Sequence, residues 1–289
     1  MDVTTRIERA LEQALDAGGQ AGCPPGLARA VHYAVFPGGA RVRPRLCLAV
    51  AAACGDPDPA LADAAAVAIE LLHCASLVHD DLPCFDDAPM RRGKPSVHSA
   101  FGERLAVLTG DALIVHAFDA LARGGLRRPE RLPALIATVA AATGMPTGIV
   151  AGQAWECETH VDLADYQRAK TGSLFAAATV AGAQAAGQDG ASWRGLGEHL
   201  GEAYQVADDI QDATAAAELL GKPTGRDRAL GRPSAVAEHG LAGAVARVKT
   251  LVSDAIAAVP DCSGSGALRS LILAESRRIL PGQVARLAA

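Results

Sequence analysis

Residues 59–81 read PALADAAAVAIELLHCASLVHDD, a stretch rich in Ala, Leu and Val that ends in two aspartates. These small and straight-chain apolar residues favour a helix. A stretch of this length without a helix breaker predicts one buried helix over residues 58–81 that carries acids at its end. Pro83 and Pro89 predict the loop that follows, because proline cannot continue a helix.

The helical pattern continues on both sides of this stretch. Apolar residues recur at three- and four-residue spacing over residues 3–16. Alternating strand patterns, short repeats and low-complexity linkers are not evident, so we expect an all-α protein with one domain over residues 1–289 and about ten helices. Besides these two, helices are expected at 41–54, 98–124, 128–143, 145–159, 163–187, 191–217, 234–258 and 265–288.

Composition excludes several classes of protein. The formal net charge is -5 and no long basic run occurs, so no nucleic-acid partner is expected. No stretch approaches the ~18 consecutive apolar residues of an integral membrane segment, and the N-terminus resembles an amphipathic helix more than a signal peptide. Seven cysteines without a CxxC pair indicate free thiols in a reducing compartment, which predicts a cytoplasmic protein.

Two acidic clusters stand out, HDDLPCFDDAPMRRGKP at 79–95 and AYQVADDIQDA at 203–213. On a helix, Asp208 and Asp212 are four residues apart and share a face, where unpaired acids repel each other. A bound cation would offset this cost, and Mg2+ takes oxygen ligands and often bridges carboxylates to phosphates. The arginines of the first cluster would bind phosphate oxygens through their fork of donors.

A single DDxxD motif is more often a solvated helix end than a metal site. Two such clusters, each ending a long apolar helix, instead predict a pit with metals at its mouth and apolar walls below. Zinc is not expected, because the spacing of the nearby His and Cys residues fits no zinc finger. Glu156 and Glu158, after the GQA at 152–154, are interpreted as a solvated face.

At this point the sequence resembles the trans-isoprenyl diphosphate synthases, and most of all the bacterial geranylgeranyl diphosphate synthases of carotenoid and chlorophyll pathways. The resemblance implies an isoprenoid synthase helical bundle around a deep central cavity. The matching motifs, in family order, are PGGARVRPRL at 37–46, HCASLVHDDLPCFDD at 73–87, RRGKPSVH at 91–98, GDAL at 110–113, GQA at 152–154, KTGSLF at 170–175, YQVADDIQD at 204–212 and GKPTGRD at 221–227.

The resemblance also implies the activity, a prenyltransferase that joins isopentenyl diphosphate to a dimethylallyl, geranyl or farnesyl diphosphate. Such enzymes use about three Mg2+ ions per site, for which Mn2+ could substitute. The matching metal ligands are Asp80, Asp81, Asp86, Asp87, Asp208, Asp209 and Asp212. Around the allylic diphosphate, the matching groups are Arg91, Lys170, Thr171, Gln205 and Lys222.

The isopentenyl diphosphate site shows one departure from the family pattern. Its matching positions are Arg41, Arg43, His73 and Arg92. The family usually has GGKRxRP, whereas Ala40 replaces the lysine here, so we expect weaker binding of this substrate. A smaller departure is Arg232, a further substrate-binding position, where a lysine is common. Residues 221–233 would form a lid.

Product length depends on the depth of the pit. The resemblance implies that the fifth residue before the first aspartate acts as a gate, which here is Ala75, with Ser76 next to it. Leu72, one turn deeper, would form part of the floor. Because Ala75 is small, the sequence predicts a C20 product, and Ala75→Phe should shorten it towards C15.

Three alternatives stay open. A farnesyl diphosphate synthase would make the C15 product, and a class I terpene cyclase would share the metal-assisted ionisation but usually has only one DDxxD motif. A non-catalytic regulatory subunit is favoured only by Ala40, since both aspartate motifs are intact. The resemblance also implies a homodimer.

Overall fold

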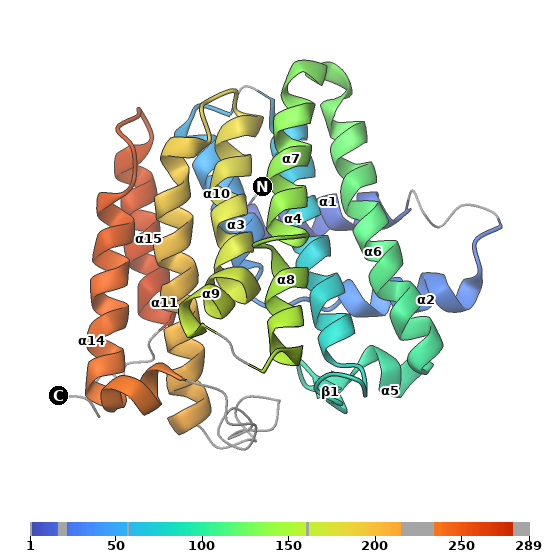
Figure 1. Ribbon diagram of the computed structural model, residues 1–289. Helices are drawn as coiled ribbons and strands as arrows, with labels where there is room; N and C mark the ends of the chain where they lie inside the picture. The colour runs from blue at the N-terminus through green and yellow to red at the C-terminus, as the bar shows by residue number, and fades with distance from the viewer. Residues whose placement is uncertain (1, 17–21, 57, 160–161, 215–233, 280–289) are drawn as a thin grey trace.

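The computed structural model describes residues 2–16, 22–56, 58–159, 162–214 and 234–279. Described elements of the first half are α1 Val3–Asp16, α2 Pro25–Val35, α3 Val42–Ala53, α4 Pro59–Asp80, β1 Met90–Arg91, β2 Lys94–Pro95, α5 Val97–Phe101, α6 Glu103–Gly124, η1 Gly125–Arg127, η2 Pro129–Arg131 and α7 Leu132–Thr143. Those of the second half are α8 Ile149–Ala154, η3 Trp155–Cys157, α9 Leu163–Gln167, η4 Arg168–Gly172, α10 Ser173–Ala185, η5 Ala191–Trp193, α11 Arg194–Thr214, α14 Ala235–Ala257 and α15 Ser265–Ile279. The predicted all-α fold is confirmed (Figure 1).

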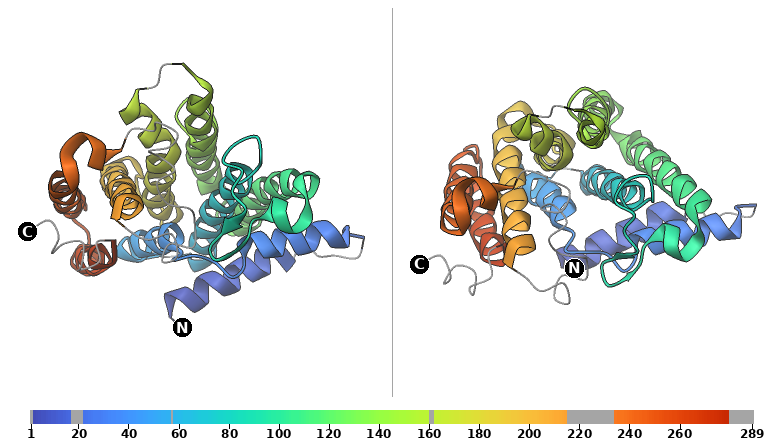
Figure 2. Two further views of the ribbon diagram at one scale, coloured as in Figure 1. Left: turned by 90° about the horizontal axis from the view of Figure 1, so that it is seen from below. Right: turned by 60° about the horizontal axis from the view of Figure 1, so that its bottom comes forward.

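Helix α4 forms the centre of the bundle, within one residue of the predicted 58–81 range. It packs against α3 and α10 on one side and against α6 on another (Figure 1). Both α4 and α10 are rich in buried alanine, which lets neighbouring helices approach closely and builds a core with few aromatic rings. Figure 2 shows α1 and α2 crossing one face of the bundle.

Four predicted helices are interrupted, one of them, 234–258, by a kink at Gly240, whose φ is +69°. The range 98–124 is divided into α5 and α6 at Gly102, whose φ of +84° cannot continue a helix. The range 163–187 is divided by η4, a single π-helical turn that carries Lys170. The range 145–159 contains the shorter α8 followed by a 3₁₀ turn. An antiparallel hairpin of β1 and β2 was not predicted, because two-residue strands leave no alternating pattern.

Two helical stretches, Pro59–Asp80 and Glu103–Arg127, are long and apolar enough to cross a membrane by length and composition alone. The first is the core helix α4, with 78% of its apolar window buried. A buried core helix passes this test for reasons unrelated to lipid. The second is only 33% buried and therefore presents apolar side chains at the surface.

Candidate active site

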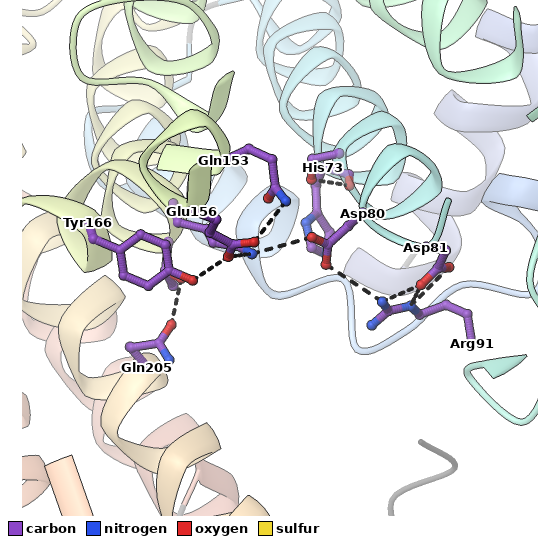
Figure 3. Close-up of polar contacts among 11 residues, drawn as sticks. His73, Asp80, Asp81, Arg91, Gln153, Glu156, Tyr166 and Gln205 are labelled. Atoms are coloured by element: carbon purple, nitrogen blue, oxygen red, sulfur yellow. Dashed lines mark hydrogen bonds and ion pairs between the residues drawn. The ribbon is translucent and has the colours of Figure 1, made fainter. Parts of the chain in front are cut away.

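The two acidic clusters, distant in sequence, converge on one pocket. This polar pocket has a volume of ≈ 260 Å³ and lies between the C-terminal end of α4, the hairpin, η4 and α11. Its acidic lining residues are Asp80, Asp86, Asp208 and Asp212, and its cationic ones are Arg43, Arg91 and Lys170. Figure 3 shows side chains from these separate segments directed toward one another.

In the first cluster, only two of the four predicted aspartates line the polar pocket. Asp81 is turned away and only 2% exposed, and its carboxylate accepts hydrogen bonds from Arg91, with Nε at 2.9 Å (Figure 3). Asp87 lies in an exposed turn with φ of +44°. Asp80 and Asp86 are therefore the candidate ligands, while Asp81 holds Arg91 in place.

The second cluster divides in the same way. Asp208 and Asp212 line the polar pocket, as expected for two residues one helical turn apart. Asp209 is 4% exposed and accepts hydrogen bonds from Gln205 Nε2 at 2.9 Å and from the backbone N–H of Ala235 at 2.8 Å. Asp209 thus connects α11 to the start of α14 and lies behind the pocket wall.

Burial and crowding set the electrostatics of the first cluster. Burial raises the pKa of Asp80 above its ordinary value, while the Lys170 ammonium opposes this shift and the Asp86 carboxylate adds to it. A carboxylate in such surroundings is stabilised by any cation that reaches it. The ammonium of Lys170, 3.3 Å from Asp80 Oδ1, is one such cation.

Thr171 and Gln205 are hydrogen-bonded to each other in the wall of the polar pocket. Thr171 Oγ1 donates a hydrogen bond to Gln205 Oε1 at 2.7 Å, and the Gln205 amide in turn donates to Asp209. These bonds fix the orientation of the Gln205 side chain, which lines the pocket. The predicted residues Lys222 and Arg232, and the predicted lid at 221–233, lie outside the described residues.

Arg43 and His73 lie side by side in one wall of the polar pocket. The guanidinium of Arg43 lies 4.5 Å from the ring centroid of Phe175 and 3.4 Å from His73 Nε2. Burial, with Arg43 adding to it, lowers the pKa of His73 well below its ordinary value, so the imidazole is neutral. Arg43 Nε is buried and has no hydrogen-bond partner within the described part of the chain. A donor of this kind suits an incoming anion.

Arg41 does not lie where the sequence analysis expected it. It is 3% exposed and donates to Glu8 at 2.8 Å, to Glu70 at 2.7 Å and to the carbonyl oxygen of Val35 at 2.8 Å. Its left-handed backbone (φ +51°), at the start of α3, directs the side chain between α1 and α4. The expectation of direct substrate contact is therefore corrected: Arg41 is engaged in a buried ion-pair network.

Arg92 is half-buried and lies over the glycine-rich turn instead of lining the polar pocket. A Cβ atom placed on Gly39 would be 3.1 Å from Arg92 Nε. The Arg92 guanidinium therefore lies next to the segment in which Ala40 replaces the family lysine.

An apolar pocket of ≈ 340 Å³ adjoins the polar one. The predicted gate and floor residues Ala75, Ser76 and Leu72 all line it, together with Ile114 on α6. Ser76, Ile149 and Gln153 line both pockets, so the charged mouth and the apolar space share a wall.

Comparison with known proteins identifies the family. The family model described as polyprenyl synthetase matches residues 24–265. The chain belongs to the polyprenyl synthetase family. It is 55% identical to the geranylgeranyl diphosphate synthase of Cereibacter sphaeroides, and 50% identical to that of Rhodobacter capsulatus, each over 97% of both chains. A geranyltransferase from Helicobacter pylori, solved with magnesium and isoprenyl diphosphate, superposes with a TM-score of 0.79 at 29% identity, covering 95% of this chain and 97% of that one.

The donor set of this polyprenyl synthetase fits magnesium. The four pocket-lining carboxylates offer only hard oxygen ligands. Within the described ranges, no three Asp, Glu, His or Cys side chains lie close enough together to hold a metal by themselves. An open arrangement suits Mg2+, which commonly keeps waters and binds through one or two carboxylates plus substrate phosphates.

Sequence reasoning missed Glu156 in this polyprenyl synthetase. It was interpreted as part of a solvated face, but its carboxylate is bonded to Lys170 at 2.5 Å and to the Tyr166 hydroxyl at 2.6 Å (Figure 3). The sequence signal was the GQA motif at 152–154, because Glu156 lies in the 3₁₀ turn that directly follows this motif. The motif alone does not say which way that helix turns.

Proposed function

We propose that this chain condenses isopentenyl diphosphate with an allylic diphosphate and releases geranylgeranyl diphosphate, the C20 product. The observation that carries the proposal is the shared wall between a pocket lined by four carboxylates and three cations and an apolar pocket. Such a pair of compartments suits a substrate with a diphosphate head and a long hydrocarbon tail.

Asp80 and Asp86 on one side, with Asp208 and Asp212 on the other, would hold Mg2+ against the allylic diphosphate. When bound, the metal neutralises the charge that develops on the departing diphosphate. The number of ions, expected to be about three, and the use of Mn2+ belong to this proposal.

The chain's own cations have separate tasks in the proposed reaction. Arg91, fixed by Asp81, and Lys170 bind the allylic diphosphate, whose C–O bond breaks so that the electron pair leaves with the diphosphate. Arg43 and neutral His73 bind the isopentenyl diphosphate. Its double bond attacks the allylic cation, a new C–C bond forms, and a proton passes to the released diphosphate.

The apolar pocket receives the growing tail and keeps water from the cation. Ala75 leaves the entrance open, which supports C20 over C15 as the product. The Gln205 side chain, oriented by Thr171, and the backbone carbonyl after Lys170 would face the cation.

We also propose a cytoplasmic homodimer. All seven cysteines lie within the described residues and are free thiols, which supports a reducing compartment. The second copy would cover the exposed apolar side chains of α6, among them Val107, Leu108 and Val115. If this face is the interface, light scattering should give a smaller molar mass for Val115→Glu than for the parent chain.

One assay separates the proposal from its alternatives. Purified protein receives Mg2+, labelled isopentenyl diphosphate and, in turn, dimethylallyl, geranyl or farnesyl diphosphate, and the products are sized. A C20 product supports the proposal, and a product that stops at C15 supports a farnesyl diphosphate synthase. Hydrocarbon formed without isopentenyl diphosphate indicates a cyclase, and turnover only with an added partner indicates a regulatory subunit.

A further inference from the structure

Lys170 lies in an unusual piece of backbone and between two carboxylates. It belongs to η4, a single π-helical turn, a distortion that is frequent at functional sites. Its ammonium is bonded to Glu156 Oε1 at 2.5 Å and to Asp80 Oδ1 at 3.3 Å. The two contacts differ, because Asp80 lines the polar pocket as a candidate metal ligand, whereas Glu156 does not line it.

Glu156 is itself held by two neutral donors. The Tyr166 hydroxyl donates to Oε1 at 2.6 Å, and the Gln153 amide donates to Oε2 at 3.1 Å (Figure 3). Both oxygens of the carboxylate are therefore bonded, and its side chain is only 17% exposed. A carboxylate fixed in this way offers the flexible Lys170 stem one defined place to bind.

The backbone of α8 is fitted to the same turn. A Cβ atom on Gly152 would lie 2.5 Å from the backbone nitrogen of Lys170 and 2.6 Å from its Cα. Only glycine permits this approach, since backbone atoms cannot move aside as a flexible side chain would. Gly152 thus brings the start of the GQAWE segment, residues 152–156, against Lys170, and Glu156 at its end reaches the ammonium.

We propose that the GQAWE segment is a positioning device for Lys170, in which Glu156 holds the ammonium at the allylic diphosphate end of the polar pocket. This inference rests on the proposed function. An aspartate that binds metal has less negative charge to share with Lys170, so the contact with Asp80 competes with metal binding. The contact with Glu156 lies outside the pocket and does not compete.

The test is a double-mutant cycle of Glu156→Gln and Lys170→Met, with Glu158→Gln as the matched control on the same segment. Glu156→Gln keeps the size and an acceptor oxygen but removes the charge. We expect it to lower kcat/KM for the allylic diphosphate about tenfold, with KM for isopentenyl diphosphate unchanged. In the Lys170→Met background, it should have no further effect. Exposed Glu158 should tolerate the change in either background.

A general structural role predicts a different result. The inference is overturned if Glu156→Gln lowers kcat/KM by the same factor with and without Lys170. It is also overturned if this variant lowers the melting temperature while kcat/KM is unchanged. Tyr166→Phe, which removes one support of Glu156 and no charge, should give a smaller loss of the same kind. If Glu156→Gln does not fold, Tyr166→Phe takes its place in the double-mutant cycle.

Calorimetry keeps the inference separate from the proposed function. Inorganic pyrophosphate with Mg2+ is titrated into the same variants, which requires no turnover. Weaker binding in Glu156→Gln, absent in the Lys170→Met background, supports the inference even if no prenyl transfer is detected. Equal affinity of the parent chain and Glu156→Gln overturns it.

Discussion

The polar pocket and the apolar pocket lie side by side along α4, yet their walls carry different side chains. In the polar pocket, four carboxylates and three cations from distant segments come together. The apolar pocket is also lined from several segments, with Leu72, Ala75 and Ser76 on α4 and others on α6 and α8, but no Asp, Glu, Lys or Arg of the described residues lines it. The polar wall suits a charged diphosphate, whereas the depth of the apolar pocket depends on the size of the side chains that line it.

This contrast predicts that substitutions separate by pocket. Changes in the polar pocket should lower the rate and leave the product length unaltered. Changes in the apolar pocket should alter the product length and affect the rate much less. Within the polar region, the structure further divides the aspartates into those that line the pocket and those that support it.

The largest effect is expected at Asp80. Asp80→Asn should lower kcat about a thousandfold, because it removes a proposed metal ligand from the reacting diphosphate. Asp87→Asn is the matched control from the same motif and should change kcat less than about threefold, since Asp87 is exposed and does not line the pocket. Steady-state kinetics at saturating Mg2+ measures both. Equal losses would contradict the division.

The second prediction concerns stability. Asp209→Ala should lower the free energy of unfolding by about 2 kcal/mol, because the Gln205 amide and the Ala235 N–H lose their acceptor. Asp208→Ala, at an exposed neighbouring position, should change it by less than about 0.5 kcal/mol. Urea denaturation compares the two. A larger loss in Asp208→Ala would reverse the assigned roles.

The apolar pocket is tested at Ala75. Ala75→Phe should shorten the main product from C20 towards C15, because the ring would fill the space in which the tail lies. The first condensation, with dimethylallyl diphosphate, should keep its rate within about threefold. Chromatography of the dephosphorylated products gives their lengths. Ser76 lines the same pocket, and Ser76→Ala adds no bulk, so this control should leave the product length unaltered. An unchanged product length in Ala75→Phe would refute the role of Ala75 as a gate.

The smallest effect is a pH dependence of stability at His73. Its pKa is lowered in the folded chain, so below the unfolded value of about 6.5 the unfolded chain binds the proton first. The stability that neutral His73 contributes at higher pH is therefore lost as the pH falls below about 6.5. Between pH 7 and 5, the free energy of unfolding should fall by about 1 kcal/mol less in His73→Gln than in the parent chain. Urea denaturation at both pH values measures this, and His239→Gln, at an exposed position, should behave like the parent.

The sequence determined the helical class, the long core helix at 58–81, the two aspartate clusters and the small residue at Ala75. These features depend on local propensity, on the absence of helix breakers and on residue type at fixed spacing, all of which are readable without contacts. The order of the family motifs then predicted prenyltransferase chemistry, which agrees with the names of the relatives, geranylgeranyl diphosphate synthases.

Only the tertiary structure decided which member of each acidic cluster reaches the pocket. Adjacent aspartates on a helix point in different directions, and the packing of α4 and α11 decides which direction meets the cavity. It also placed Arg41 in a buried network and Glu156 on Lys170, because each ion pair joins segments that no local pattern brings together. The sequence shows which charged side chains are present and how they are spaced, but the fold determines which charged side chain each one pairs with.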